Sequence, residues 1–221
     1  MFTNDYVMRM IELFVRAVAR ITGLRESGEK EEAYALLQDT IKGVLGVNAD
    51  TVDGLDYDTF VTIMAAGGAL TPERYLLLSE LMRIKGEMAQ EEGREAIAAA
   101  LLEKGLCLHL AAVQQEPALE QQPLPKQRLE QMREALEGYQ LAERTYAMLA
   151  RWQEHRGHFG QAEDALYQRM EADGHSEATV RDTLAFYDRL LALPEAALEL
   201  GNLPLHEICQ AREELSKRLP G

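Results

Sequence analysis

The 221-residue chain contains 37 Asp and Glu residues and 23 Lys and Arg residues, which leaves a formal net charge of −14 at pH 7. Such a charge repels phosphate backbones and anionic bilayers, so we expect no nucleic acid and no membrane among its partners. Hydrophobic residues make up 47% of the chain, an ordinary value for a protein with its own core, and this excludes a disordered chain.

The first segment predicts an amphipathic helix that begins after Asn4 or Asp5. Val7, Phe14 and Val18 follow at helical spacing. Charged residues interrupt this segment, so we expect no signal peptide, and no run of about 18 apolar residues elsewhere predicts a membrane-spanning helix. The two cysteines form no Cys-x-x-Cys motif, which suits a reducing compartment. We therefore expect a cytoplasmic protein.

Helical spacing recurs to the end of the chain, and no segment alternates apolar and polar residues as a half-buried strand does. Glycines and prolines divide the chain into about nine or ten helices. Two helix starts are marked by capping residues, since Thr71 precedes Pro72 and Ser176 precedes an apolar periodic segment. These patterns predict an all-α fold.

A proline-rich segment at residues 116–125 contains Pro117, Pro123 and Pro125 and predicts an extended connection. We expect a single all-helical domain over residues 1–221, with this segment as its possible point of subdivision. Residues 126–156 are expected to form one long helix, because the apolar residues from Leu129 to Trp152 keep helical spacing.

Three stretches share the pattern of a glycine, four residues and an alanine. Glycine adopts the left-handed conformation that ends many helices, and alanine allows two helices to approach closely. The glycines lie 93 − 28 = 65 and 157 − 93 = 64 residues apart, close to twice the period of about 34 residues in tetratricopeptide repeats. The pattern predicts helical hairpins at Gly28 to Ala33, Gly93 to Ala98 and Gly157 to Ala162.

The third hairpin resembles a tetratricopeptide repeat, because Tyr146, Leu149 and Ala150 match the large, aliphatic and small positions of the first helix of that family, and Leu166 matches the large position of the second. Lys85 departs from the pattern, since an aliphatic residue is usual at its position in the second unit. The resemblance implies an irregular array of antiparallel helix pairs, an α–α superhelix, with a groove for a protein or peptide partner.

The chain also resembles an uncharacterised bacterial family whose members open with an Asn-x-Asp-Tyr-x-Met-Arg-like helix and continue with a Gly-x-x-x-x-Ala hairpin. Residues Asp5 to Arg9 and Gly28 to Ala33 carry this likeness. The resemblance implies a repeat-like helical fold with no established activity, and it transfers no catalytic residue.

Motifs for nucleotide binding and hydrolysis are missing from the chain, including the phosphate loop and the nucleophile elbow. Cys107 and His109 do not suit one zinc ion, because side chains two residues apart on a helix point about 200° apart. After His206, Gln210 occupies the place of the second histidine in a zinc-protease helix. We therefore expect no enzyme, no metal site and no cofactor.

Arginines on two predicted helices are the candidate partner-binding residues. Arg9, Arg16 and Arg20 share a helical face in a segment where, up to residue 25, basic residues outnumber acidic ones four to two. Arg144 and Arg151 share a second face. Guanidinium groups bind carboxylates through paired hydrogen bonds, so such a face could hold an acidic peptide or an anion. The alternative is a solvated face on which arginines pair with acidic neighbours along the helix.

These features favour a non-enzymatic scaffold or adaptor that binds a protein or peptide in a groove between helix pairs. A regulatory or sensory helical bundle with a small ligand is the alternative, since nine methionines could line an adaptable pocket. An enzyme is a remote third possibility. The sequence leaves the identity of the partner and the oligomeric state open.

Overall fold

The computed structural model describes residues 15–66 and 68–219. In this part of the chain every regular element is a helix and no strand occurs, which confirms the all-α prediction. The chain divides into two compact units, Met1–Glu137 (unit 1) and Gly138–Gly221 (unit 2). Each unit has a hydrophobic core of its own.

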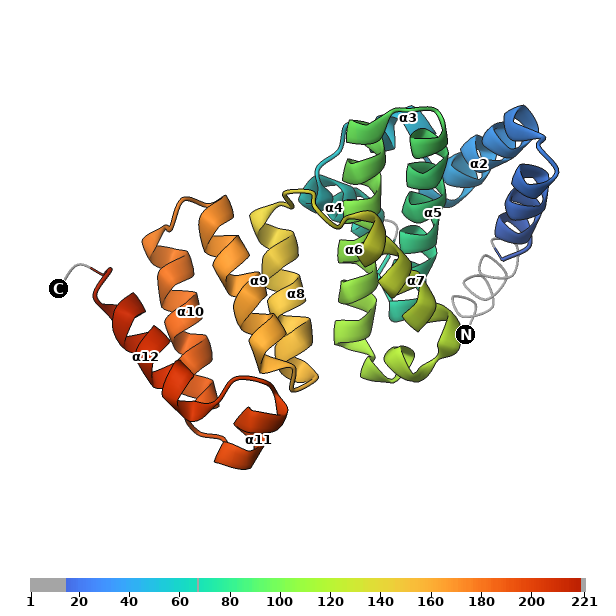
Figure 1. Cartoon of the computed structure of the whole chain (residues 1–221). Coiled ribbons are helices and arrows are strands. Elements are labelled where there is room, and N and C mark those ends of the chain that lie inside the picture. Colours follow the sequence, from blue (N-terminus) through green and yellow to red (C-terminus); the bar gives the residue numbers. More distant parts are fainter. Residues whose placement is uncertain (1–14, 67, 220–221) are drawn as a thin grey trace. The chain divides into compact units, whose positions relative to one another are not determined.

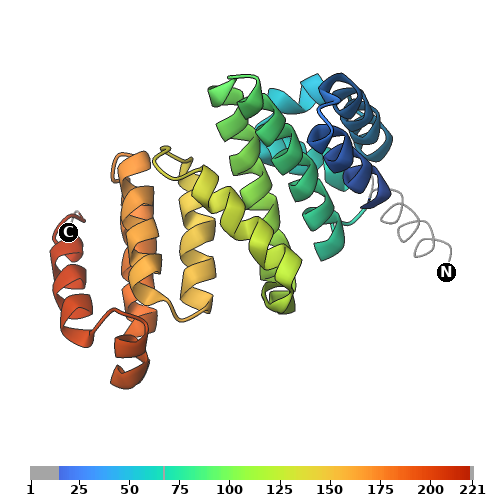
Figure 2. The ribbon, with the colours of Figure 1, turned by 45° about the vertical axis from the view of Figure 1, so that its right-hand side comes forward.

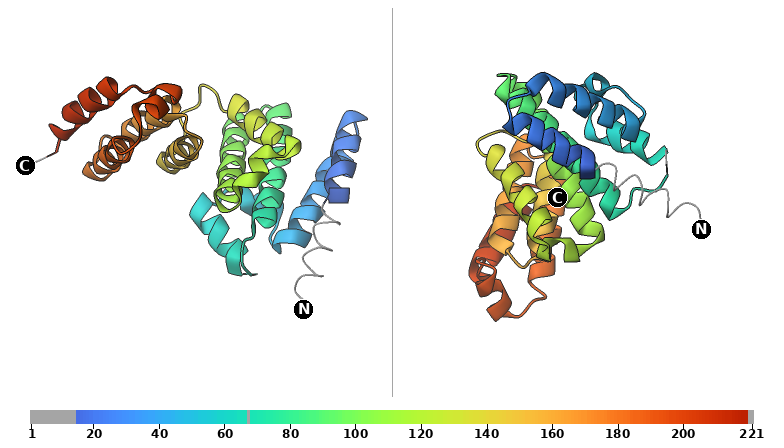
Figure 3. Two further views of the ribbon diagram at one scale, coloured as in Figure 1. Left: turned by 90° about the horizontal axis from the view of Figure 1, so that it is seen from below. Right: turned by 90° about the vertical axis from the view of Figure 1, so that its right-hand side faces the viewer.

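Unit 1 is built around a long antiparallel helix pair, α5 (Pro72–Glu91) and α6 (Glu95–Gln115). Another helix, α7 (Pro123–Ala135), packs across this pair (Figure 1). The helical residues 15–26 and α2 (Lys30–Leu45) lie side by side (Figure 3). The remaining elements are α3 (Ala49–Asp53), α4 (Tyr57–Ala66) and the 3-10 helix η1 (Pro117–Gln121).

Apolar side chains of α5 and α6 form the centre of the core of unit 1. Leu81, Met82 and Ile84 on α5 are completely buried. Gly86 allows close approach of the two helices, because a Cβ atom at this position would lie 2.8 Å from Cγ of Leu102. Because α5 and α6 pack so closely, polar side chains that point inward from these helices have little access to water.

Unit 2 is a row of helices in which α8, α9, α10 and α12 follow one another, with the short helix α11 at one end (Figures 1 and 2). Its core includes Leu166, Met170, Tyr187 and Ile208, all of them buried. The helices are α8 (Glu143–His155), α9 (Phe159–Ala172), α10 (Glu177–Leu190), α11 (Glu195–Leu200) and α12 (Leu205–Ser216).

The three predicted hairpin turns share one backbone structure. Gly28, Gly93 and Gly157 have positive φ angles of 82°, 74° and 75°. Each glycine donates its N–H to the carbonyl three residues earlier, and the next residue donates to the carbonyl five residues before itself, the Schellman pattern. The alanine of each stretch is buried. Local sequence specifies these turns, because glycine adopts this φ without the steric strain of a side chain.

The helix caps predicted at Thr71 and Ser176 are present, whereas the helix start expected at Asn4 or Asp5 lies outside the described residues. Thr71 Oγ1 accepts a hydrogen bond from the N–H of Arg74 at 3.4 Å, and Pro72 occupies the first turn of α5. Ser176 Oγ accepts one from the N–H of Thr179 at 3.3 Å at the start of α10. Each hydroxyl satisfies a backbone donor that has no partner within the helix.

The last part of unit 1 and the start of unit 2 differ from the prediction. Residues Pro117–Gln121 form η1 and Pro123 begins α7, where a proline removes no helical hydrogen bond. The prediction of a single helix over residues 126–156 is wrong, because α7 ends at Ala135 and α8 begins only at Glu143. Gly138, with φ of 82°, lies in this break. The division between the units falls there, after Glu137, and not within residues 116–125.

Helix α6 is long and apolar, although no membrane-spanning helix was predicted from the sequence. By length and composition alone it is a candidate to cross a membrane, contrary to that expectation. Most of its residues are buried inside unit 1, including the charged residue Lys104. A core helix passes the same test as a membrane span, and the apolar side chains of α6 pack in the core of unit 1.

Candidate functional site

The predicted partner-binding arginines belong to both units. Arg16 and Arg20 are exposed on the helical residues 15–26 of unit 1, whereas Arg9 lies outside the described residues. Arg144 and Arg151 are exposed on α8 of unit 2. Each pair is therefore a surface of its own unit.

One side of α8 presents four residues at steps of four, three and four, which places them along a single line on the helix. The opposite side of α8 is made by Tyr146, Ala150 and Gln153, which are buried. Three residues of the line are exposed and its methionine is half-buried. We call this line the α8 stripe: Arg144, Met148, Arg151 and His155.

The α8 stripe combines positive charge with an apolar contact. Arg144 and Arg151 are seven residues apart, which corresponds to about 10 Å along the helix axis. Two glutamates four residues apart on an extended peptide point to the same face about 13 Å apart, and their flexible side chains would reach both guanidinium groups. Met148 between them offers a flexible apolar surface to a neighbouring side chain. The stripe therefore suits an acidic peptide with one apolar residue.

Unit 1 buries two lysines, Lys85 on α5 and Lys104 on α6. Lys85 forms an ion pair with Asp53, and its Nζ donates to the carbonyl oxygen of Ala49 at 2.5 Å. Lys104 Nζ donates to the carbonyl oxygen of Val52 at 2.7 Å. All three partners belong to α3, namely the carbonyl oxygens of Ala49 and Val52 and the carboxylate of Asp53. The two lysines therefore fasten α3 to the central helix pair.

The environment of Lys104 disfavours its charged form. Burial lowers the pKa of Lys104 to about 8 from the ordinary 10.5, the charge of Asp53 opposes this shift, and the charge of Lys85 adds to it. The ring centre of Phe60 lies 5.6 Å from Nζ and attracts the ammonium group. Below about pH 8 the buried ammonium is present, at a cost to folding.

We expect the stability of unit 1 to rise between pH 8 and pH 10.5 through Lys104. In this window the unfolded lysine keeps its proton while the folded one has lost it, so rising pH favours the folded state. The gain amounts to at most about 3 kcal/mol. Urea unfolding followed by circular dichroism at several pH values measures it, and Lys104→Met should remove the rise. An unchanged pH dependence in that variant would assign the effect to other groups.

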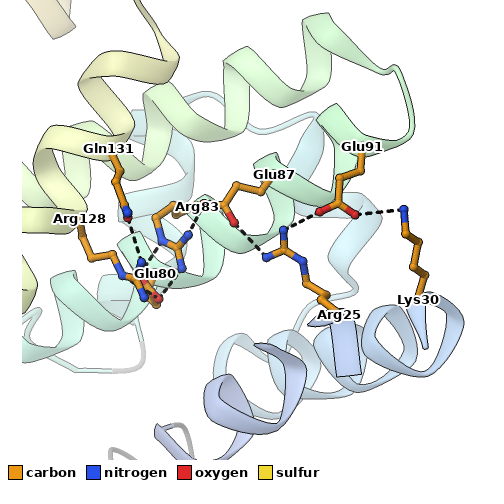
Figure 4. A network of polar contacts seen from close by, with 8 residues as sticks. All are labelled: Arg25, Lys30, Glu80, Arg83, Glu87, Glu91, Arg128 and Gln131. Carbon is orange, nitrogen blue, oxygen red and sulfur yellow. Dashed lines mark hydrogen bonds and ion pairs between the residues drawn. The ribbon is translucent and has the colours of Figure 1, made fainter. Parts of the chain in front are cut away.

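A network of ion pairs crosses unit 1 (Figure 4). Arg83 on α5 is buried and lies between Glu80 and Glu87 of the same helix. Arg25, from the helical residues 15–26, donates to Glu87 at 2.9 Å and to Glu91 at 2.7 Å. The hydrogen bond from Arg25 lowers the pKa of Glu91. The network thus holds the N-terminal helical residues against α5.

Two further cations extend this network to other elements. Lys30 on α2 lies 3.4 Å from Glu91, and Arg128 on α7 lies 3.4 Å from Glu80 and donates to Gln131 at 2.9 Å (Figure 4). Most of these pairs are partly solvated, so each contributes no more than about 1 kcal/mol. Arg25, one of the four basic residues of the N-terminal segment, therefore has a structural role.

Polar contacts in unit 2 also connect its helices. Arg169 on α9 forms ion pairs with Glu143 on α8 and, at 2.8 Å, with Asp182 on α10. The buried Tyr187 of α10 donates its hydroxyl to Glu163 of α9 at 2.6 Å. Burial raises the pKa of Glu163, and this hydrogen bond opposes the shift. These groups join neighbouring helices to one another.

Large apolar side chains are exposed where α10 ends and α11 and α12 begin. Leu200 is 89% exposed, and Leu191, Leu193 and Leu205 are between 36% and 39% exposed. Leu198, two residues before Leu200 on the same short helix, is completely buried. The segment is therefore packed against unit 2, and only some of its leucine side chains are exposed.

Sequence reasoning did not find the buried lysines or the exposed leucines. Lys85 stood out only as a departure from the tetratricopeptide pattern, and Lys104 is a lone cation in a mostly apolar helix. A single lysine in an otherwise mostly apolar helix is the signal that could have located Lys104. Leu200 lies within residues 190–211, which contain no lysine or arginine. This stretch without positively charged residues is the signal that could have located the exposed leucines.

Comparison with known proteins gives a family and no activity. A family model described as "Family of unknown function (DUF6483)" matches residues 1–219. Neither a curated protein nor a solved structure matches the chain. The family match agrees with the predicted likeness to a family without established activity, and it covers both units. The chain belongs to the DUF6483 family of unknown function.

Proposed function

We propose that this protein is a non-enzymatic interaction scaffold and that the α8 stripe is a binding surface for an acidic segment of a partner protein. The observation that carries the proposal is the line of Arg144, Met148, Arg151 and His155 on the side of α8 opposite its buried residues. A basic line contrasts with the net charge of −14. An acidic partner repelled by most of the chain would therefore be directed to this line.

The pairing of α8 and α9 supports the tetratricopeptide-like part of the proposal. The two helices pack against each other across the turn at Gly157. Tyr146, Ala150 and Leu166, which match the repeat pattern, are buried in unit 2. Helix pairs of this kind commonly present one helix face to a peptide, which is the role proposed for α8.

The methionines favour the scaffold over a small-ligand sensor. Met64, Met82, Met88, Met132 and Met170 are buried among core residues of the two units. Methionine fills irregular gaps in hydrophobic cores, and this use accounts for more than half of the nine methionines in the chain. The high number of methionines, which suggested an adaptable pocket, is thus explained by the packing of the two cores.

Replacing both arginines of the stripe should weaken acidic-peptide binding about tenfold or more, because each charge-assisted hydrogen bond contributes on the order of 1.5 kcal/mol. The probe is a fluorescein-labelled peptide with two glutamates four residues apart and a leucine midway between them, so that all three side chains share one face of the extended peptide. Fluorescence anisotropy of the full chain compares wild type with the double variant Arg144→Ala, Arg151→Ala. The double variant Arg16→Ala, Arg20→Ala tests the arginines of unit 1 in the same assay.

A matched control removes the same charge elsewhere on unit 2. Arg181 on α10 pairs with Glu177, and Lys217, directly after α12, pairs with Glu213; both cations are exposed. The variant Arg181→Ala, Lys217→Ala should keep the affinity of wild type. Equal losses in this variant and in the α8 variant would mean that general electrostatic attraction, and not the α8 stripe, binds the peptide.

A further inference from the structure

The end of unit 2 formed by α11 and its two connections has an unusual surface. Residues 190–211 contain three glutamates and neither lysine nor arginine. Four leucines of this segment are exposed, and Leu200 is the most exposed of them. We call this surface the α11 end: Leu191, Leu193, Leu200 and Leu205 with Glu195, Glu199 and Glu207.

Packing fixes the segment that carries Leu200. Leu198 and Leu203 are buried on either side of it, and the N–H of Leu203 donates to the carbonyl of Leu198 at 3.0 Å. The N–H of Gly160, in the first turn of α9, donates to the carbonyl of Gly201 at 3.0 Å. Leu200 therefore projects from an anchored turn, and a partner would meet it with little ordering cost.

Two of the three carboxylates near these leucines have no counter-ion among the described residues, and the third, Glu207, lies 3.9 Å from Nε2 of His206. The carboxylates of Glu195 and Glu199 have no ion pair with any residue that the structure describes. The nearest arginines along the chain are already paired, Arg189 with Glu154 and Arg212 with Asp188. The exposed apolar side chains thus share their surface with free negative charge.

We propose that the α11 end binds an amphipathic helix of a partner protein, one whose apolar face is flanked by lysine or arginine. The leucines would enter the apolar face, and the glutamates would pair with the flanking cations. This inference rests on the proposed function as an interaction scaffold, but it concerns a different surface and a partner of opposite charge to that of the α8 stripe.

The same charge argues against other occupants. A second copy of the chain related by a twofold axis would bring its own glutamates against those of the first, because such an interface uses the same patch twice. An anionic bilayer would be repelled by the three carboxylates. A basic amphipathic helix is the occupant that satisfies both the apolar and the charged part of the α11 end.

The test uses two helical peptides with leucines at positions i, i+3, i+4 and i+7, one flanked by lysines and the other by glutamates. Fluorescence anisotropy measures binding of each to the full chain. We expect the lysine peptide to bind at least about tenfold more tightly, and Leu200→Ser to weaken it about tenfold. This substitution leaves the net charge unchanged, so its effect separates specific docking from attraction to an acidic protein.

Two variants and one measurement of mass complete the test. Leu124→Ser removes another well-exposed leucine, on α7 of unit 1, and should leave affinity unchanged. Glu195→Lys with Glu199→Lys should transfer the preference to the glutamate peptide. Equal binding by wild type and Leu200→Ser would overturn the proposal. A dimer of the wild-type chain in light scattering that is lost in Leu200→Ser would also overturn the proposal, because a second copy of the chain would then occupy the α11 end. Neither result depends on Arg144 or Arg151.

Discussion

Replacing Asp53 by alanine is expected to destabilise unit 1 by about 3 kcal/mol or more, because it leaves the buried ammonium group of Lys85 without its counter-ion. Lys85 is 2% exposed, and its other contact is the single carbonyl oxygen of Ala49. Alanine offers no acceptor in place of the carboxylate, and only the edge of this site at Asp53 is exposed to water. The charge therefore remains poorly solvated in the folded state, whereas it is hydrated after unfolding.

Urea unfolding followed by circular dichroism measures this loss, and fluorescence of Trp152, the only tryptophan, follows unit 2 separately. Asp39→Ala, at an exposed position on α2, is the matched control and should change stability by less than about 0.5 kcal/mol. Adding Lys85→Met to Asp53→Ala removes the orphaned charge and should recover much of the loss. Equal stability of the Asp53 and Asp39 variants would show that the ion pair does not hold α3.

Replacing Gly201 by alanine is expected to destabilise unit 2 by about 2 kcal/mol, through steric overlap alone. A Cβ atom at this position would collide with the ring of Phe159 and would lie 2.6 Å from the carbonyl oxygen of Gly157. The φ angle of Gly201 is −80°, which any residue adopts, so backbone strain makes no contribution. The turn after α11 would have to move away from the start of α9.

Fluorescence of Trp152 during urea unfolding reports this change in unit 2. Gly174→Ala distinguishes steric overlap from backbone strain. Gly174 has φ of 70° and open space around it, so the expected loss of about 1 kcal/mol in this variant would come from backbone strain alone. Gly43→Ala, in open space on α2 and without a positive φ, should stabilise its helix slightly. If Gly201→Ala matches wild type, the turn is looser than its packing indicates, and Leu200 is not held rigidly.

The candidate surfaces were predictable to different extents. The periodicity of α8 placed Arg144 and Arg151 on one face, and the structure finds both exposed. The exposure of Leu200 was not predictable, because Leu198 and Leu200 are the same residue type on one short helix and only the contacts of α11 with the rest of unit 2 bury the first. A helical pattern of six residues is too short to define a buried face.

Sequence alone determined the helical class, the caps at Thr71 and Ser176 and the turns at Gly28, Gly93 and Gly157. These features depend on the conformational preferences and hydrogen-bonding groups of residues close together in the chain, so they can be read locally. The tertiary structure alone decided that the units separate near Gly138 and that Lys85 is neutralised by Asp53, 32 residues away. Such pairings depend on which helices pack together, and a buried charge is tolerated only where that packing supplies its partner.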